Sequence, residues 1–286
     1  MAFRGLIKNN SNQAFFIKIK EIKSILIIAG SDSCGGAGMQ ADIRTLTSLG
    51  FHPLSVLTAL TAQNSMGIND IYPIPSAFVL KQLETIITDI PVQAVKVGML
   101  FSIANIKEIA NFIKSHKLPH VVLDPILSAS TGISLLEYKA IPVLKEILLP
   151  FANVVTPNIH EAGILAGTRI RNQKDMFQAA KLIKEMGPDV VITGGHLEKE
   201  PIDIVYDGNN FQQISGLRLD TPHTHGSGCV FSSALAAFLS QKNDLIKAAE
   251  LAHDFVRHAI KQGYPCGSGS GPVHAGWKQD SISDGS

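Results

Sequence analysis

The sequence has few cysteines, almost no net charge and no long apolar run. Its three cysteines, Cys34, Cys229 and Cys266, form neither a CxxC pair nor a cluster with histidine at metal-ligand spacing, which argues against a disulfide scaffold and a zinc site. The longest apolar runs, such as residues 25–29 and 234–239, are far too short to cross a bilayer. A net charge of +1 with interspersed signs gives no electrostatic footprint for nucleic acid or an anionic membrane. We therefore expect a small-molecule partner, no nucleic acid and no membrane.

The N-terminal region carries no secretory signal pattern. Its brief apolar run ends at Lys18 without a clear cleavage site, so we expect a cytoplasmic protein. Residues 1–23 are basic, which leaves an organelle-targeting role open beside a flexible tail. We predict a flexible extension over residues 1–23, a single domain over residues 24–275 and a tail over residues 276–286. We expect no further catalytic domain after Trp277.

Short β-branched runs alternate along the chain with stretches whose apolar residues recur at helical spacing. The runs predict strands at residues 25–29, 55–61, 94–97, 120–123, 153–155 and 190–193, and an antiparallel hairpin at 204–206 and 211–214. The helical stretches are residues 39–49, 76–90, 102–115, 135–148, 158–165, 175–186, 227–240 and 244–261. This order predicts an α/β fold of βα units around a mostly parallel sheet that is buried on both faces.

Glycine or polar residues follow each predicted parallel strand. They are Gly30, Asp32, Gln63, Asn64, Gly98, Met99, Asp124, Asn158, Glu161, Gly194 and Gly195. Taken singly, most of these residue types are ordinary in turns. Because ligands of such sheets bind beyond the carboxyl ends of the strands, their convergence at one edge predicts the functional site.

The run from Thr224 to Cys229, Thr-His-Gly-Ser-Gly-Cys, precedes a small apolar helix. Gly226, Ser227 and Gly228 would let the backbone approach a ligand, and the helix N-terminus would direct unpaired N–H groups toward an anion. The same N–H groups would lower the thiol pKa of Cys229. This pattern indicates a phosphate site with a titratable group beside it, hence phosphoryl transfer. The alternative is a plain turn that caps a buried alanine-rich helix.

A second glycine run, Gly35-Gly36-Ala37-Gly38, opens a helix directly after the first strand of the predicted domain. It matches neither GxxxxGK[ST] nor GxGxxG, which argues against a P-loop and a dinucleotide fold. The motif set of protein kinases is absent as well. The run therefore allows a close backbone approach to a ligand without identifying a familiar nucleotide-binding class.

Seven segments together are far more specific than any single motif. They are AGSDSCGGAGMQAD (29–42), TALTAQN (58–64), KVGML (96–100), LDP (123–125), TPN with Glu161 (156–161), GGH (194–196) and GSGC (226–229). In this order the segments resemble the hydroxymethylpyrimidine and phosphomethylpyrimidine kinases of thiamine biosynthesis, which belong to the ribokinase-like superfamily. The resemblance extends from about residue 24 to about residue 274.

The resemblance implies a three-layer α/β/α fold, a homodimer, ATP and Mg²⁺, and two successive phosphorylations of an aminopyrimidine. It implies that Gln63 hydrogen-bonds the pyrimidine, a task that suits an amide because it offers both a donor and an acceptor. Gly30, Asp42 and Met99 would help to form the same pocket. The residues alone leave an alternative for each: Gln63 as a polar strand end, Asp42 as a solvated first-turn carboxylate and Met99 as a core residue.

The same resemblance implies that Glu161 and Asn158 arrange Mg²⁺ and its waters, with Asp124 on the phosphate side. Oxygen ligands suit this hard cation. Asn158 is also a candidate N-cap, and Asp124 is also a candidate turn residue before Pro125. Cys229 stands where most of the superfamily has an aspartate base. A weak base suffices if phosphoryl transfer is loose.

Two departures from the family pattern remove positive charge. Thr193 and Ser130 stand where many members carry lysine, so phosphate neutralisation would depend more on Mg²⁺ and on the helix N-terminus. Cys34 follows the first strand of the predicted domain, where oxidation would couple it to Cys229. Two other functions stay open: a pyridoxine or pyridoxal kinase, and a non-catalytic pyrimidine-binding module.

Overall fold

The computed structural model describes residues 6–8, 14–16, 22–129, 132–195 and 201–277. Their main feature is a nine-stranded sheet in the order β11-β10-β9-β8-β7-β6-β3-β4-β5. The strands of this sheet are β3 (Ser24–Asp32), β4 (His52–Asn64), β5 (Gly67–Pro73), β6 (Ala94–Val97), β7 (Val121–Leu123), β8 (Val154–Val155), β9 (Asp189–Ile192), β10 (Ile202–Tyr206) and β11 (Phe211–Ser215). The six strands from β9 to β4 are parallel, while β5 at one edge and β10 and β11 at the other are antiparallel.

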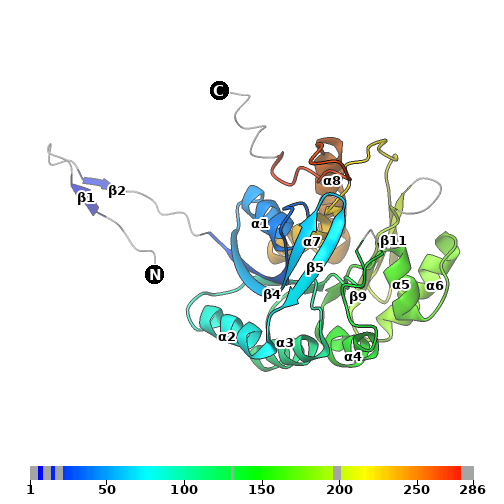
Figure 1. Cartoon of the computed structure of the whole chain (residues 1–286), viewed down its shortest axis with the longest axis horizontal. Helices are drawn as coiled ribbons and strands as arrows, with labels where there is room; N and C mark the ends of the chain where they lie inside the picture. Colours follow the sequence, from blue (N-terminus) through cyan, green and yellow to red (C-terminus); the bar gives the residue numbers. More distant parts are fainter. Residues whose placement is uncertain (1–5, 9–13, 17–21, 130–131, 196–200, 278–286) are drawn as a thin grey trace.

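Helices cover both faces of this sheet, as Figure 1 shows. One face carries α2 (Ser76–Ile87), α3 (Ile103–His116), α4 (Ala140–Val143) with the π-helix η1 (Leu144–Leu148) and the 3-10 helix η2 (Leu149–Phe151), α5 (Ile159–Ala166) and α6 (Gln173–Lys184). The other face carries α1 (Gly38–Ser48), α7 (Ser227–Ser240) and α8 (Leu245–Lys261). The fold is therefore the expected three-layer α/β/α arrangement.

Alternating side chains of β3 explain why the sheet needs helices on both faces. Leu26 and Ile28 belong to the apolar cluster under α2–α6, whereas Ile25 and Ile27 belong to the cluster under α1, α7 and α8. All four are fully buried, since successive side chains of a strand point to opposite faces.

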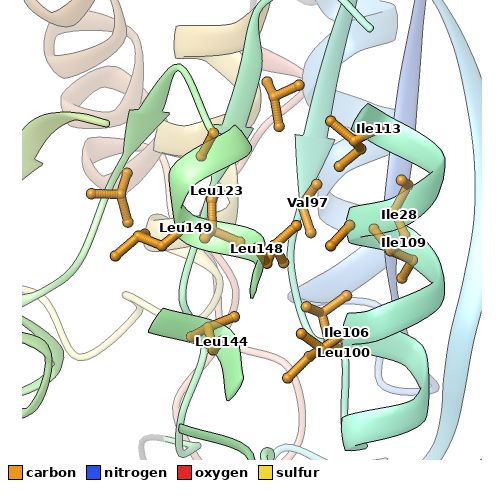
Figure 2. Packing of buried hydrophobic residues seen from close by; sticks show 14 of the residues in the cluster. Ile28, Val97, Leu100, Ile106, Ile109, Ile113, Leu123, Leu144, Leu148 and Leu149 are labelled. Atoms are coloured by element: carbon orange, nitrogen blue, oxygen red, sulfur yellow. The ribbon is translucent and has the colours of Figure 1, made fainter. Parts of the chain in front are cut away.

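Figure 2 shows part of the cluster under α2–α6. The α3 residues Ile106, Ile109 and Ile113 face Ile28 and Val97 of the sheet. Their spacing of three and four residues places them on one side of the helix. This packing holds the strand ends of β3 and β6 in place below the candidate site.

The structure differs from the sequence-based elements in two places. The helical stretch expected at residues 135–148 begins only at Ala140 and runs through π and 3-10 turns to Phe151. The strand expected at residues 55–61 extends to Asn64, and β5 pairs with it antiparallel. The sequence analysis missed β5 because Gly67–Pro73 contains both an asparagine-aspartate pair and a proline, which usually end strands.

Regular structure also occurs within the N-terminal extension. Strands β1 (Leu6–Lys8) and β2 (Ala14–Phe16) pair antiparallel, outside the main sheet. At the other end of the chain, the ring of Trp277 stacks on His258 of α8 with centroids 4.8 Å apart. None of the described helices is long and apolar enough to span a membrane.

Candidate active site

The two glycine runs meet at the carboxyl-end edge of the sheet. Gly226 has a φ of +82°, a left-handed conformation that favours glycine, and a Cβ at this position would collide with the carbonyl oxygen of Gly36. A Cβ on Gly36 would in turn collide with the His225 ring. The loop before α1 and the loop before α7 therefore pack backbone against backbone.

The N-terminus of α7 is built as the sequence predicts. Gly226 is the N-cap and offers no side chain to the first-turn N–H groups, while Ser227, Gly228 and Cys229 form that first turn. The N–H of Ser227 donates to the carbonyl of Thr224 at 3.2 Å. An α-helix of 14 residues directs its positive dipole end toward this loop, so the geometry suits a phosphate group.

The pKa of the Cys229 thiol is shifted in the direction opposite to the one expected. Burial raises it to about 12, and the nearby carboxylates of Asp42 and Asp124 add to this, while Lys96 and the N–H of Gly38 act against it. Only 7% of Cys229 is exposed, so the desolvation of a thiolate outweighs the helix N-terminus. The expected lowering of this pKa is wrong, and Cys229 is a neutral thiol in this structure.

A buried lysine that the sequence analysis did not single out lies beside this thiol. Lys96, on β6, is fully buried, and its Nζ lies 2.8 Å from Oδ2 of Asp42 on α1. Oδ1 of Asp42 accepts a hydrogen bond from Ser233 on α7 at 2.8 Å. Gly98 has no side chain to interfere, since a Cβ there would lie 2.8 Å from the lysine Nζ. A charged residue inside the apolar run AVKV was the available sequence signal.

Asp42 is therefore not the solvated first-turn carboxylate that the residues alone allowed. Its exposed fraction is 0%, and both oxygens are bonded, one to Lys96 and one to Ser233. Burial raises its pKa, while the charge of Lys96 and these hydrogen bonds act in the other direction. In this conformation Asp42 joins α1, β6 and α7 and does not face the open side of the site.

Asp124 continues the same buried network. Its Oδ2 lies 4.0 Å from the Nζ of Lys96 and accepts a hydrogen bond from Ser232 on α7 at 3.0 Å. Burial raises the pKa of Asp124, and Asp42 adds to this, while Lys96 and Ser232 lower it. Asp124 thus connects the end of β7 to the helix that carries the thiol, which is more than a turn role before a proline.

Glu161 and Asn158 form a reciprocal capping box at the start of α5. The backbone N–H of Asn158 donates to Oε2 of Glu161 at 2.9 Å, and the backbone N–H of Glu161 donates to Oδ1 of Asn158 at 3.0 Å. The predicted capping role of Asn158 is therefore confirmed. Burial, with a smaller effect of Asp124, raises the pKa of Glu161 to about 8.

These acid groups bear on whether the site suits Mg²⁺. Asp42, Asp124 and Glu161 are three buried carboxyl groups, whereas Lys96 is the cation within the described network. A divalent cation would balance this excess of acid groups, and it usually keeps several waters. Within the described ranges, no three His, Cys, Asp or Glu side chains group to hold a metal. The carboxyl oxygens of Asp124 and Glu161 are of the type that suits this hard cation.

Gly30 and Met99 meet at the ends of β3 and β6, as the expectation of a shared pocket requires. A Cβ on Gly30 would lie 2.7 Å from Sδ of Met99. Thr58 on β4 donates to the Met99 carbonyl at 2.5 Å. Met99 is 6% exposed and packs with Ala59 and Leu135 in a small apolar cluster, so it acts at least as a core residue.

Gln63 lies at the end of β4, next to the loop before α7. Its Nε2 is 3.4 Å from Nε2 of His225, and its Oε1 is 3.3 Å from Oγ1 of Thr61. The same Nε2 of His225 lies 3.0 Å from Oδ2 of Asp32. The structure thus brings Gln63, the two glycine loops and the start of α7 to one edge. His225 was inside the motif that the sequence analysis singled out but had no role there.

Two residues that depart from the family pattern differ in what the structure describes. The N–H of Thr193 donates to the carbonyl of Pro157 at 3.0 Å, and Thr193 forms an isolated bridge with Asn158. Ser130 and His196 lie outside the described residues.

A cleft of about 800 Å³ lies next to the start of α5. Asn158 and Arg169 are among the residues that line it.

Cys34 has a different neighbour from the one expected. Burial raises the pKa of Cys34, and the negative charge of Asp32 and the thiol of Cys266 in the C-terminal segment add to this. Cys266, and not Cys229, is the cysteine that acts on the pKa of Cys34, so the coupling expected between Cys34 and Cys229 has a competitor.

Comparison with known proteins agrees with the geometry. The family model described as phosphomethylpyrimidine kinase matches residues 32–274. The chain is 41% identical over 254 residues to the hydroxymethylpyrimidine/phosphomethylpyrimidine kinase of Streptomyces coelicolor, covering 88% of this chain and 94% of that protein. It is 44% identical over 253 residues to the thiamine biosynthesis bifunctional protein ThiED of Geobacter sulfurreducens, covering 88% of this chain and 52% of that protein. The chain thus spans about half the length of the bifunctional relative.

Among solved structures, the ADP complex of Bacillus subtilis pyridoxal kinase has a TM-score of 0.84 and 36% identity to this chain. The match covers 91% of this chain and 100% of that one.

Proposed function

Because this chain belongs to the phosphomethylpyrimidine kinase family, we propose that it phosphorylates 4-amino-5-hydroxymethyl-2-methylpyrimidine with ATP and then phosphorylates the resulting monophosphate. Each step transfers the γ-phosphoryl group of ATP to an oxygen of the pyrimidine substrate and leaves ADP. The observation that carries this proposal is the approach of Gln63 to His225 at 3.4 Å. It unites the candidate ring-binding amide with the candidate phosphate loop.

In this proposal the ring lies against Gln63, with Gly30 and Met99 nearby, and its hydroxymethyl group points to α7. The N-terminal turn at Gly226, Ser227 and Gly228 binds the migrating phosphoryl group. Backbone N–H groups and the helix dipole stabilise negative charge there without reorganisation. Asp42 supports this geometry indirectly, because its carboxylate holds Lys96 between α1 and α7.

Cys229 lies at the position for contact with the attacking hydroxyl. Its raised pKa means that the thiol keeps its proton at neutral pH. A loose transition state needs little deprotonation of the nucleophile before transfer. Cys229 therefore contributes mainly by positioning the hydroxyl, and the hydroxyl proton passes to an oxygen of the transferred phosphoryl group once the new P–O bond has formed.

Asp124, Glu161 and Asn158 are the groups that would arrange Mg²⁺ and its waters. When bound with ATP, Mg²⁺ supplies charge neutralisation at the phosphates. Glu161 must give up its proton to act as an anion near the cation, because its pKa of about 8 keeps most of it protonated at neutral pH. With Thr193 in place of a lysine, these acid groups and α7 would bear more of the phosphate alignment.

A pyridoxal kinase is the second candidate, favoured by the similarity to the Bacillus subtilis pyridoxal kinase. A third candidate, a non-catalytic pyrimidine-binding module, would not need the buried thiol and acid groups beside the phosphate loop. The test is ATP consumption with hydroxymethylpyrimidine, its monophosphate and pyridoxal, each with and without Mg²⁺. We expect Mg²⁺-dependent ADP formation with the two pyrimidines at higher kcat/KM than with pyridoxal. Ligand binding without ADP formation would favour the module.

We also propose a cytoplasmic homodimer. Leu60 and Tyr72 are cross-strand partners on β4 and β5, and both are exposed, at 41% and 66%. Exposed apolar groups beside an edge strand favour association. Light scattering after gel filtration is expected to give twice the mass of the chain, and a monomer would contradict this part of the proposal.

A further inference from the structure

His225 lies between a carboxylate and the amide of Gln63. Its Nε2 is 3.0 Å from Oδ2 of Asp32 and 3.4 Å from the Gln63 amide. The side chain of Asp32 also accepts hydrogen bonds from three backbone N–H groups. These donors are Cys34 at 2.8 Å, Gly36 at 3.0 Å and Ala37 at 2.8 Å. The loop before α1 therefore holds this carboxylate in a fixed position opposite the histidine ring.

The surroundings of Asp32 determine which ring nitrogen carries hydrogen. Asp32 is 4% exposed, and the bonds from His225 and the loop lower its pKa despite the opposing effect of burial. An ionised carboxylate is only an acceptor. The Nε2 of His225 must therefore be a donor, and the tautomer with hydrogen only on the other ring nitrogen is excluded.

This hydrogen restricts the orientation of the Gln63 amide. The structure places the amide nitrogen of Gln63 next to Nε2 of His225, but an Nε2–H group cannot accept a hydrogen bond from the amide NH₂. The amide oxygen is therefore the end that belongs there, because it can share the hydrogen that Nε2 donates to Asp32. The two ends of a glutamine amide are almost identical in shape, and the hydrogen-bond network decides between them.

Thr61 supports the same orientation from the other side. Its hydroxyl donates to the carbonyl of Ser31 at 3.0 Å, and a hydroxyl has only one hydrogen to give. The structure places the amide oxygen of Gln63 3.3 Å from this hydroxyl, but a hydroxyl already committed to Ser31 accepts, and turning the amide over brings its NH₂ to Thr61 instead. No donor then faces another donor between Asp32 and Ser31, and the single Nε2 hydrogen of His225, given mainly to Asp32 at 3.0 Å, is shared with the amide oxygen of Gln63 at 3.4 Å.

We propose that His225 is a positioning residue that, held by Asp32, fixes which end of the Gln63 amide faces each part of the bound ring and thereby sets the preference for an aminopyrimidine over a pyridine ring. This inference rests on the proposed function. An aminopyrimidine edge presents a ring-nitrogen acceptor beside an exocyclic NH₂ donor, and its partner must present a donor and an acceptor in the matching order. A reversed amide would set donor against donor and leave buried groups unpaired, which costs about 1–3 kcal/mol. That cost corresponds to roughly five- to a hundred-and-fiftyfold in affinity.

The test compares two rings across matched variants. His225→Leu removes the donor, whereas His225→Gln keeps an N–H donor near the same point. His223→Leu is the control, because His223 lies two residues before His225 in the same loop, where its Nδ1 accepts a hydrogen bond from the N–H of Gly271 at 3.2 Å. We expect His225→Leu to raise the KM for hydroxymethylpyrimidine roughly tenfold or more, with kcat and the KM for pyridoxal changing much less. His225→Gln should restore most of the preference, and His223→Leu should leave the ratio of kcat/KM values unchanged.

A uniform loss on both rings, or no change on either, would overturn the positioning role while leaving the kinase function intact. A wild-type protein that phosphorylates neither ring would refute the proposed function and the preference with it. Should His225→Leu fail to fold, His225→Gln and Asp32→Asn carry the kinetic comparison, and the second is expected to reduce the preference.

The tautomer of His225 can be measured directly by NMR. Long-range ¹⁵N correlation spectra of the imidazole groups, assigned with the His225 variants, are expected to show hydrogen on Nε2 of His225 in the wild type. Asp32→Asn should weaken that preference. Hydrogen on Nδ1 alone would overturn the inference, whichever ring the enzyme phosphorylates.

Discussion

The Nζ of Lys96 lies 2.8 Å from Oδ2 of Asp42, and neither side chain has any exposed surface. This pair joins β6 to α1, and Ser233 extends it to α7. Removing one partner leaves the other as an uncompensated buried charge, which is far more costly than losing the pair as a whole.

The two single substitutions of this pair should therefore cost more stability in sum than the double substitution does. We expect Lys96→Met and Asp42→Asn each to lower the free energy of unfolding by about 3–5 kcal/mol, and the double variant to lose clearly less than the sum. Lys184→Met is the control, because Lys184 pairs with Asp189 at 2.7 Å at a partly exposed site. Urea unfolding should show a loss below about 1 kcal/mol for this control. Additive losses at Lys96 and Asp42 would show that the two charges do not depend on each other.

Two glycines at the start of α7, Gly226 and Gly228, should differ in how well they tolerate substitution by alanine. Gly226→Ala places a Cβ against the Gly36 carbonyl at a positive φ, whereas a Cβ on Gly228 meets nothing within 4 Å. We expect Gly226→Ala to lower the midpoint of thermal unfolding by several degrees, and Gly228→Ala to leave it nearly unchanged. Differential scanning calorimetry decides the matter. Equal midpoints for the two variants would contradict the backbone contact.

Substitution of the buried thiol should affect turnover far more than substrate affinity. Because the thiol positions the attacking hydroxyl, Cys229→Ala is expected to reduce kcat by roughly a hundredfold. KM for the pyrimidine should change only slightly, and Cys229→Ser should retain part of the activity. Initial rates over a range of substrate concentrations separate the two parameters. Near-normal turnover in Cys229→Ala would remove Cys229 from the mechanism.

Glu161 should make stability depend on pH near neutrality. Its pKa of about 8 in the fold lies above the ordinary value of 4.5, so the folded state binds a proton that the unfolded state has lost. This contribution to stability is complete below about pH 4.5 and is lost as the pH rises toward 8, at up to about 1.4 kcal/mol per pH unit. Thermal unfolding of Glu161→Gln should be less pH-dependent than that of the wild type across this window.

Asp175→Asn is a suitable control for that experiment. Asp175 also accepts a backbone N–H near a helix start, from Arg171 at 2.8 Å, but at an exposed site. Its variant should keep the pH dependence of the wild type. Identical pH curves for Glu161→Gln and the wild type would show that Glu161 is ionised in the fold.

Mild oxidation should link Cys34 to Cys266 and not to Cys229. Cys266 is the cysteine that acts on the pKa of Cys34, and diamide accepts the two electrons and two protons that disulfide formation releases. Peptide mapping without reductant should recover a peptide pair containing Cys34 and Cys266, absent in Cys266→Ser. The raised pKa of Cys34 should make the reaction faster at pH 9 than at pH 7. A recovered disulfide between Cys34 and Cys229 would contradict this expected pairing.

Much of the fold follows from local sequence patterns. The β-branched runs predict the parallel strands, and the helical spacing predicts most helices, because each of these patterns lies within the residues of the element itself. The edge strand β5 has weaker patterning and forms because β4 offers it hydrogen bonds. Likewise the π and 3-10 turns after Ala140 depend on packing against α3, which no local pattern contains.

The candidate site was only partly predictable for the same reason. Asn158 and Glu161 are three residues apart, so their capping box can be read from the sequence. The pKa of Cys229 depends on burial and on charges from β6 and α1, and these are visible only in the fold. Lys96 and His225 belong to recognisable segments, but the partners that give them a role lie 54 and 193 residues away.

The separation between Asp32 and His225 has a consequence for how the enzyme is made. The ribosome completes the first glycine loop early, but that loop has no counterpart until more than two hundred residues have been synthesised. A fragment that stops short of α7 lacks two of the three helices that cover one face of the sheet, and it lacks the phosphate loop as well. Premature termination or cleavage in the last third of the chain should therefore abolish activity outright, leaving no partially working product for the cell to tolerate.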